Sequence, residues 1–353
     1  MLKFIHIADV HLGAAPDAQM SWGEKRKQDI RNTFYRLLKQ AGQQKIPLVL
    51  IAGDLFHGQP LKRELKELNE RFADLSQTQI VFIAGNHDYV HPKSYYRGFP
   101  WADNVHFLWK NEMQEIYLPQ LQTTVYGSSY WHQQESGDVY GNCRPSNRPG
   151  YHILLLHGGD AQHRPFSPDK LAKAGFDYIA CGHIHRAGHI VENRVVMAGA
   201  LEPVDQNDLG PHGYWLTELE GKSGRAYFYP IKNCQYVKTE VEVTQEMGMY
   251  QIEELVRRRL AEREDYEISH LCLTGYREPD VQIDTERFSE MERIVSIMDH
   301  TKPAYDFEKL KRRYSGGLIE KFIRCMEGHP DQELARKALY YGMDAIYMSG
   351  DEE

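Results

Sequence analysis

The sequence has few cysteines and no paired cysteine motif. Its five cysteines are odd in number, widely spaced and never arranged as Cys-x-x-Cys. A disulfide framework or a thiolate zinc site would need paired or closely spaced cysteines, so neither kind of site is supported. We expect these residues to be buried free thiols.

Long apolar runs and a secretory leader are also missing. No apolar stretch approaches the roughly 18 residues that a membrane-spanning helix needs. The N-terminal MLKFIHIADVH has the pattern of a strand and lacks the regions of a signal peptide. We therefore expect a cytoplasmic protein without a membrane partner.

An excess of positive charge is absent as well. The chain of 353 residues has 42 basic and 50 acidic residues and a net charge of −8. This balance argues against a protein that coats nucleic acid by bulk electrostatics, but it permits a local basic groove. The length and the 41% hydrophobic content suit a large globular domain with an appendage.

Polar side chains follow five apolar, strand-like segments. The segments are FIHIADVH, LVLIAGDLFH, IVFIAGNHD, HILLLHGG and YIACGHIH. Between the first three, apolar residues recur at helical spacing after Ser21 and again after Leu61, which gives a β-α-β-α-β series. Such a series forms a parallel sheet with right-handed crossovers, so the polar residues should meet at one sheet edge. They are Asp9, His11, Asp54, His57, Asn86, His87, Asp88, His157, His183 and His185.

Seven of these residues suit metal binding. Residues two apart in extended chain leave the same face, so Asp9 with His11, and His183 with His185, can each bind one ion. Two Asp, one Asn and four His form a nitrogen and oxygen ligand set for Mn²⁺, Fe²⁺ or Zn²⁺. Seven ligands are too many for one ion, so we expect two, bridged by Asp54. A single histidine after a strand is more often structural, and only the joint pattern favours metal.

The expected charge of this centre indicates its substrate. Two divalent ions opposed by two carboxylates leave about two positive charges, which favour an anionic substrate, and paired ions are suited to phosphoester hydrolysis. His87 is positioned to stabilise the transition state or to protonate the leaving oxygen, with Asp88 orienting its ring. His163 and the other histidines outside the motifs are interpreted as surface or packing residues.

The remaining chain predicts further sheets and helices. Val195–Met197, Tyr214–Leu219 and Ala226–Ile231 are interpreted as successive strands of a second sheet, and Ser167-Pro168 as the start of a short helix. We expect an α/β four-layer α-β-β-α sandwich over 1–232, a small α+β domain over 233–283, and a mostly helical region over 284–353. The polar insertion 133–149 has no assigned role.

The motifs resemble the signature of calcineurin-like metallophosphoesterases. The resemblance rests on Asp9-Val10-His11, Gly53-Asp54, Gly85-Asn86-His87-Asp88, His157-Gly158 and Gly182-His183-Ile184-His185. It implies the metallophosphoesterase sandwich, and it makes His87 the catalytic histidine. One metal would take Asp9, His11, Asp54 and His185. The other would take Asp54, Asn86, His157 and His183.

A narrower resemblance links the chain to the DNA-repair exonuclease branch of SbcD-like and YhaO-type nuclease subunits. It rests on ADVHLG and on GDLFH, where His57 follows Asp54 by three residues. It implies a Mn²⁺-dependent DNA exonuclease that acts 3′ to 5′, also with endonuclease activity, in which His57 positions the DNA strand. The 233–283 region would be a DNA-binding cap over the active site. Gly199-Ala200 departs from the Gly-Ser of many relatives.

The same resemblance implies partners for the C-terminal region. Residues 284–353 would dock on an SbcC-like coiled-coil ATPase, and a homodimer is compatible with it. A docking stripe and the inside of a helical bundle are equally good interpretations of the apolar residues Leu310, Leu318, Ile319, Phe322, Ile323 and Met326.

Candidate DNA-binding cations flank the motifs. They are Lys62 and Arg63 after the His57 turn, Arg186 after the second histidine pair, and Arg257 in the appended domain. Charge runs are also common as solvated helix faces. Two alternative functions remain: a small-molecule or cyclic-nucleotide phosphodiesterase, and a non-catalytic DNA-binding scaffold for an ATPase.

Overall fold

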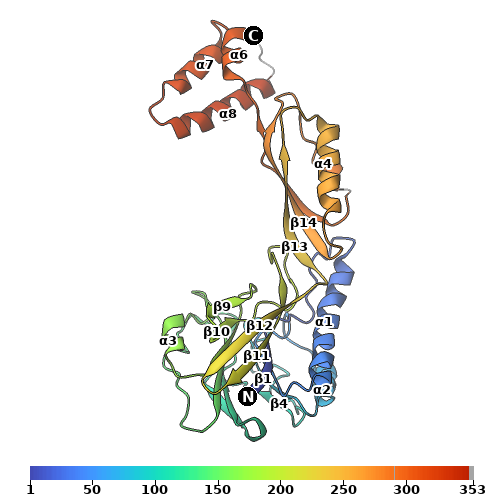
Figure 1. Cartoon of the computed structure of the whole chain (residues 1–353), viewed down its shortest axis with the longest axis vertical. Helices are drawn as coiled ribbons and strands as arrows, with labels where there is room; N and C mark the ends of the chain where they lie inside the picture. The colour runs from blue at the N-terminus through green and yellow to red at the C-terminus, as the bar shows by residue number, and fades with distance from the viewer. Residues whose placement is uncertain (290, 350–353) are drawn as a thin grey trace. The chain divides into compact units, whose positions relative to one another are not determined.

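The computed structural model describes residues 1–289 and 291–349 (Figure 1). The chain divides into one unit over Met1–Tyr236 and a second that begins at Val237, and each is described by itself. Residue 290 and the last four residues of the predicted 284–353 region lie outside the described residues. None of the described helices is both long enough and apolar enough to cross a membrane.

The first unit contains two six-stranded sheets. Sheet 1 has the order β12-β11-β1-β2-β3-β4, and sheet 2 has the order β5-β6-β7-β8-β10-β9. The strands of sheet 1 are β1 (Leu2–Ile7), β2 (Leu48–Ala52), β3 (Gln79–Ile83), β4 (Val105–Phe107), β11 (His212–Glu220) and β12 (Ser223–Ile231). Those of sheet 2 are β5 (Gln114–Leu118), β6 (Thr123–Gly127), β7 (Tyr151–His157), β8 (Tyr178–Gly182), β9 (Gly188–Val191) and β10 (Val195–Met197).

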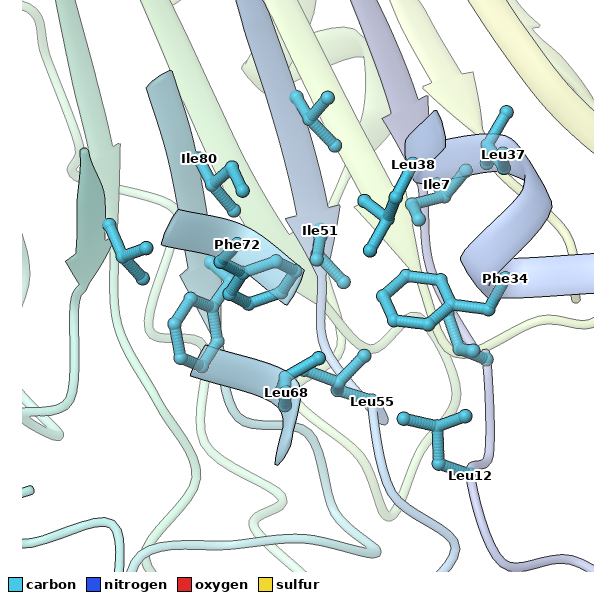
Figure 2. Close-up of a cluster of buried hydrophobic side chains, with 14 of the residues drawn as sticks. Ile7, Leu12, Phe34, Leu37, Leu38, Ile51, Leu55, Leu68, Phe72 and Ile80 are labelled. Carbon is cyan, nitrogen blue, oxygen red and sulfur yellow. The ribbon is translucent and has the colours of Figure 1, made fainter. Parts of the chain in front are cut away.

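Three apolar layers hold these sheets in a sandwich. Helices α1 (Gly23–Gln43) and α2 (Lys62–Ala73) cover sheet 1, where Phe34 and Phe72 pack against Ile51 (Figure 2). The two sheets face each other through a second cluster that includes Leu50 and Leu155. Helix α3 (Pro168–Ala172) packs on the outer face of sheet 2. Because both faces of the central strands are covered, these strands are continuously apolar, and the predicted α-β-β-α architecture is confirmed.

Strand pairing corrects one prediction about the second sheet. β10 does lie in sheet 2, parallel to β8, but β11 and β12 belong to sheet 1. β11 pairs antiparallel with β1 from Leu2↔Leu219 to His6↔Trp215. The alternation of side chains along β11 is the same in either sheet, so the sequence pattern could not decide between them.

The starts of α3 and α1 show how well local sequence signals predict where a helix begins. The side chain of Ser167 accepts a hydrogen bond from the Lys170 amide, which confirms the predicted cap of α3. Ser21-Trp22-Gly23-Glu24 has the spacing of a capping box, but Ser21 does not cap α1: the helix begins at Gly23, Trp22 is its N-cap, and no side chain caps it.

The second unit begins as an α+β element. β13 (Gln235–Val243) and β14 (Glu267–Arg277) flank α4 (Met249–Ala261) in sequence, as expected. After α5 (Glu286–Ser289), β15 (Ile294–Asp299) and β16 (Lys302–Pro303) pair with β14. The chain beyond Asp284 is mostly helical, as predicted, but β15 and β16 precede the helices that start at Phe307. The domain boundary predicted between residues 283 and 284 stays a prediction. The pairing of β15 and β16 with β14 favours a boundary later in the chain.

Helices α6 (Phe307–Arg313), α7 (Leu318–Glu327) and α8 (Gln332–Ser349) follow. Leu310, Ile319 and Ile323 are buried in the core of these helices, where Phe322 and Met326 pack against them. Leu318 is 68% exposed. Most of the candidate docking stripe thus forms the inside of a helical bundle.

Candidate metal centre

The predicted site residues lie where strands of the two facing sheets end. In sheet 1, Asp9 follows β1, Asp54 follows β2 and Asn86 follows β3; in sheet 2, His157 ends β7 and His183 follows β8. Asp9 and Asp54 have left-handed backbone, each with φ of 49°. This conformation is uncommon outside glycine and is frequent at functional turns.

Two motif glycines allow the turns to approach each other. A Cβ on Gly53 would lie 2.3 Å from Nδ1 of His157, and one on Gly85 would lie 2.2 Å from Oδ1 of Asp54. Both distances are shorter than non-bonded atoms tolerate. The glycines in the Gly-Asp and Gly-Asn-His-Asp motifs are thus required because ligand side chains occupy the space of a Cβ.

The first group of candidate ligands comprises Asp9, His11 and His185. One side-chain donor atom from each lies within 4.8 Å of the others. The Nε2 atoms of His11 and His185 are 3.2 Å apart. Asp9 and His11 are almost fully buried, so this group is closed to bulk water on the β1 side.

The second group comprises Asn86, His157 and His183. Oδ1 of Asn86 lies 2.9 Å from Nε2 of His157 and 3.1 Å from Nδ1 of His183. Asp54 lies between the groups, with Oδ2 at 3.3 Å from Nε2 of His157 and 3.8 Å from Nε2 of His11. The structure thus brings all seven predicted ligands together, with Asp54 between the two groups.

The hydrogen bonds of His157 show that a cation fits the second group. Its Nδ1 lies 2.8 Å from the carbonyl oxygen of Ala52, so Nδ1 carries the proton in the neutral ring. Nε2 then directs a lone pair toward Asp54 Oδ2 and Asn86 Oδ1, which also carry lone pairs. Three buried acceptors directed at one another are stabilised by a positive charge between them, and a divalent ion suits this ligand set.

Burial and neighbouring charges shift the pKa values of these groups. Burial lowers the pKa of His11 to about 3 and that of His183 to about 4. Burial alone would also lower the pKa of His157, but the Asp54 carboxylate raises it to about 9. Burial would raise the pKa of Asp54, but the His157 imidazole lowers it well below its usual range. A proton on His157 therefore compensates the carboxylate when no ion does, and metal binding must displace that proton.

Carboxylates that the motifs did not reveal support both histidines of the second pair. Asp208 lies 3.0 Å from Nδ1 of His185, which leaves Nε2 for the first group. Asp160 lies 2.7 Å from Nε2 of His183 and 2.9 Å from Nδ1 of His163. Such carboxylate–histidine contacts fix the tautomer and orientation of metal-binding imidazoles. Asp160 follows the His-Gly-Gly motif directly, whereas no local pattern marks Asp208.

His163 was interpreted as a surface or packing residue, but its ring centroid lies 4.5 Å from that of His183. It therefore contacts the site through both the Asp160 carboxylate and the neighbouring ring. Sequence reasoning missed it because it belongs to no strand-end motif.

His57 and His87 lie beside the first group. Their rings stack with centroids 5.2 Å apart, and His87 meets the His11 ring edge-on at 4.8 Å. Nδ1 of His87 lies 3.2 Å from the carbonyl oxygen of His57, and the His87 amide donates to Oδ1 of Asp54 at 2.8 Å. The turns after β1 and β2 thus hold His87 in place, because His11, Asp54 and His57 in these turns contact its ring and its amide.

Asp88 occupies a different place from the one predicted. Its Oδ2 accepts hydrogen bonds from the amides of Leu55 and Phe56 and from the Tyr96 hydroxyl, and its Oδ1 accepts from the Gly85 amide. Burial raises the pKa of this carboxyl to about 7. The expected orientation of the His87 ring by Asp88 is wrong, because the His57 carbonyl makes that contact and Asp88 instead ties two ligand turns together.

The insertion 133–149 contacts the centre through Tyr140. The Tyr140 hydroxyl lies 3.2 Å from both the amide nitrogen and the carbonyl oxygen of His157. The Tyr130 hydroxyl donates to the same carbonyl at 3.1 Å. The buried guanidinium of Arg164 stacks on Tyr130 and donates to Tyr140, so the insertion helps to hold the His157 backbone in place.

The candidate DNA-binding cations are all exposed. Lys62 and Arg63 lie at the start of α2, and Arg186 follows His185 directly. Arg257 lies on α4 in the second unit and donates to Glu253 at 2.7 Å. Of the four, Arg186 is the one that adjoins a candidate ligand.

The part of the chain that contains the candidate site matches a known protein family. The profile of the calcineurin-like phosphoesterase family matches residues 2–187, which is more than half of the chain and includes every candidate ligand. The chain is 27% identical over 274 residues to the uncharacterized metallophosphoesterase YhaO of Bacillus subtilis, a match that covers 72% of this chain and 66% of YhaO.

Two archaeal relatives carry the name DNA double-strand break repair protein Mre11. The protein from Methanopyrus kandleri is 24% identical, with 73% of this chain and 62% of that protein covered. The protein from Sulfurisphaera tokodaii is 30% identical, with 62% of this chain and 58% of that protein covered. The matches span less than two thirds of the length of each of these relatives.

Proposed function

The chain belongs to the calcineurin-like phosphoesterase family, and from this premise we propose that it is a two-metal nuclease that cleaves phosphodiester bonds of DNA. One observation carries the proposal: two groups of lone-pair donors, buried except for the partly exposed His183 and His185, meet around Asp54. Similarity to proteins named for DNA double-strand break repair supports DNA as the substrate. We propose Mn²⁺ as the ion, with Fe²⁺ and Zn²⁺ as alternatives that the ligand set also suits.

The chemistry requires charge at the centre and a proton donor beside it. Two divalent ions, when bound, supply Lewis acidity toward a phosphodiester and toward water. Asp9, His11, Asp54 and His185 would hold one ion. Asp54, Asn86, His157 and His183 would hold the other.

His87 supplies the proton step in this proposal. Its Nδ1 donates to the His57 carbonyl, so in the imidazolium form Nε2 carries the second proton. That proton can stabilise the transition-state charge or pass to the departing oxygen. His57, whose ring stacks on His87, would position the strand, and Asp88 acts only by holding the turns.

DNA binding is proposed to use the exposed cations Lys62, Arg63 and Arg186, which would contact backbone phosphates. Arg257 would contribute from α4 of the second unit, where phosphate must first displace Glu253. We further propose 3′ to 5′ exonuclease action with additional endonuclease activity, and docking of the C-terminal helices on a coiled-coil ATPase. These finer points rest on the motif resemblance.

The decisive experiment incubates the purified protein with end-labelled duplex DNA and Mn²⁺, with and without a candidate ATPase. We expect shortening from the 3′ end in the wild type and none in Asp54→Ala, which loses a carboxylate shared by both groups. Hydrolysis of an aryl phosphodiester without cleavage of DNA would instead favour a small-molecule phosphodiesterase. Binding of DNA without cleavage would favour a scaffold.

A further inference from the structure

A cleft of about 690 Å³ adjoins the metal centre on the His185 side. It lies within the first unit, and its lining runs from His185 and Arg186 across the Asp208 loop to β11 and β12. The candidate ligand His185 therefore belongs both to the centre and to the wall of the cleft. The volume is within the range of about 300–1,000 Å³ that is typical of small-molecule sites.

The apolar part of the lining suits a flat ring. Trp215 and Phe228 pack with centroids 5.3 Å apart, and His189 meets Trp215 edge-on at 4.8 Å. Leu209 is 52% exposed on the opposite loop. Trp215 itself is 4% exposed and lies behind Phe228, so the half-buried Phe228 ring and the exposed Leu209 form the apolar surface on which a nucleobase can stack.

The polar part of the lining accepts an anionic ligand. Asp208 is the acidic residue of this lining. Its carboxylate receives hydrogen bonds from His185 Nδ1 and from the amides of Val204 and Asp205, so its charge is compensated locally. Arg186 supplies an exposed positive charge, whereas the side-chain amide of the exposed Asn207 already donates to Asp205. The exposed charge of Arg186 favours a nucleotide phosphate beside this lining.

We propose that this cleft binds the nucleoside on one side of the scissile phosphate, with its base against Phe228 and Leu209. The inference rests on the proposed function, because a phosphodiester held at the centre extends its two ester arms to opposite sides. The arm on the His185 side enters the cleft. Cleavage should therefore depend on the base on one side of the scissile bond and not on the base on the other.

The test uses oligonucleotides that carry a single abasic residue immediately 5′ or 3′ of the cleaved bond. In the wild type with Mn²⁺, one of the two abasic substrates should be cleaved about five- to a hundredfold more slowly, the loss expected for one stacked base. Phe228→Ala and the exposed Leu209→Ala should slow the intact substrate and reduce this difference. Tyr227→Ala is the matched control, because Tyr227 is the 44% exposed neighbour on the other face of β12.

Binding to the metal-free protein separates this inference from the proposed function. Ligand-observed NMR with deoxyadenosine should show binding that Phe228→Ala and Leu209→Ala weaken at least fivefold and Tyr227→Ala does not. If no DNA is cleaved, the nuclease proposal fails, and this measurement alone decides the cleft. Equal deoxyadenosine binding by wild type and both cleft variants, or equal cleavage of intact and abasic substrates, would overturn the inference.

Discussion

Replacing Asp208 with asparagine tests whether carboxylates outside the motifs tune the two ion sites separately. Asp208 contacts Nδ1 of His185 at 3.0 Å, whereas Asp160 contacts Nε2 of His183 at 2.7 Å. The two histidines face different groups of ligands. Loss of one carboxylate should therefore weaken one ion and leave the other nearly unchanged.

The size of the effect follows from what asparagine removes. Burial alone would lower the pKa of His185, but the hydrogen bond that its Nδ1 donates to Asp208 raises the pKa to about 9, so the carboxylate strongly favours positive charge on this ring. Contacts of this kind typically change metal affinity 10- to 100-fold, or about 1.4–2.7 kcal/mol. Because asparagine can still accept the Nδ1 proton, we expect a loss of about tenfold for Asp208→Asn and more for Asp208→Ala.

Isothermal titration with Mn²⁺ at constant pH measures both affinities. Asp205→Asn is the matched control, because Asp205 is an exposed residue of the same loop that contacts Asp208 through its amide. Asp160→Asn should weaken the other ion. Equal Mn²⁺ affinities for Asp208→Asn and Asp205→Asn at both sites would refute the assignment of Asp208 as a positioning residue.

Three further predictions address other parts of the unit. His87→Asn should keep both ions in a Mn²⁺ titration but lower cleavage about 10²-fold or more, and unchanged turnover would reject His87 as the acid. Tyr140→Phe leaves the buried His157 amide without its hydroxyl partner, so denaturant titration should show a loss of about 1–3 kcal/mol. Burial lowers the pKa of His6 to about 3, so the unfolded chain binds a proton below about pH 6.5 and the folded chain does not. His6 should therefore contribute a loss of about 2 kcal/mol to the stability of the metal-free protein between pH 7.5 and 5, and the stability difference between wild type and His6→Leu should change by that amount over this range.

Much of the site could be predicted from local patterns. Asp9, Asp54 and Asn86 follow three consecutive parallel strands, and consecutive parallel strands bring their carboxyl ends to one edge whatever the details of packing. Gly53 and Gly85 belong to the motifs, where the sequence alone gives no reason for them. Their reason became visible only when the neighbouring side chains were in place.

Other predictions failed where the actual partners are distant in sequence, or where two arrangements fit the same sequence pattern equally well. Asp88 was expected to orient His87, because adjacent residues are easily imagined as partners. The fold instead turns Asp88 toward the amides of Leu55 and Phe56, some thirty residues earlier in the chain. Likewise, an alternating strand such as β11 fits either sheet, and only pairing with β1 decides which.

The sequence by itself determined the ligand types and their order along parallel strands, because both follow from side-chain chemistry and from short-range periodicity. Tertiary structure alone decided which nitrogen of each histidine faces the centre. That choice depends on the second hydrogen bond of each ring, made to Ala52 for His157, to Asp160 for His183 and to Asp208 for His185. These partners come from turns that only folding brings within hydrogen-bonding distance.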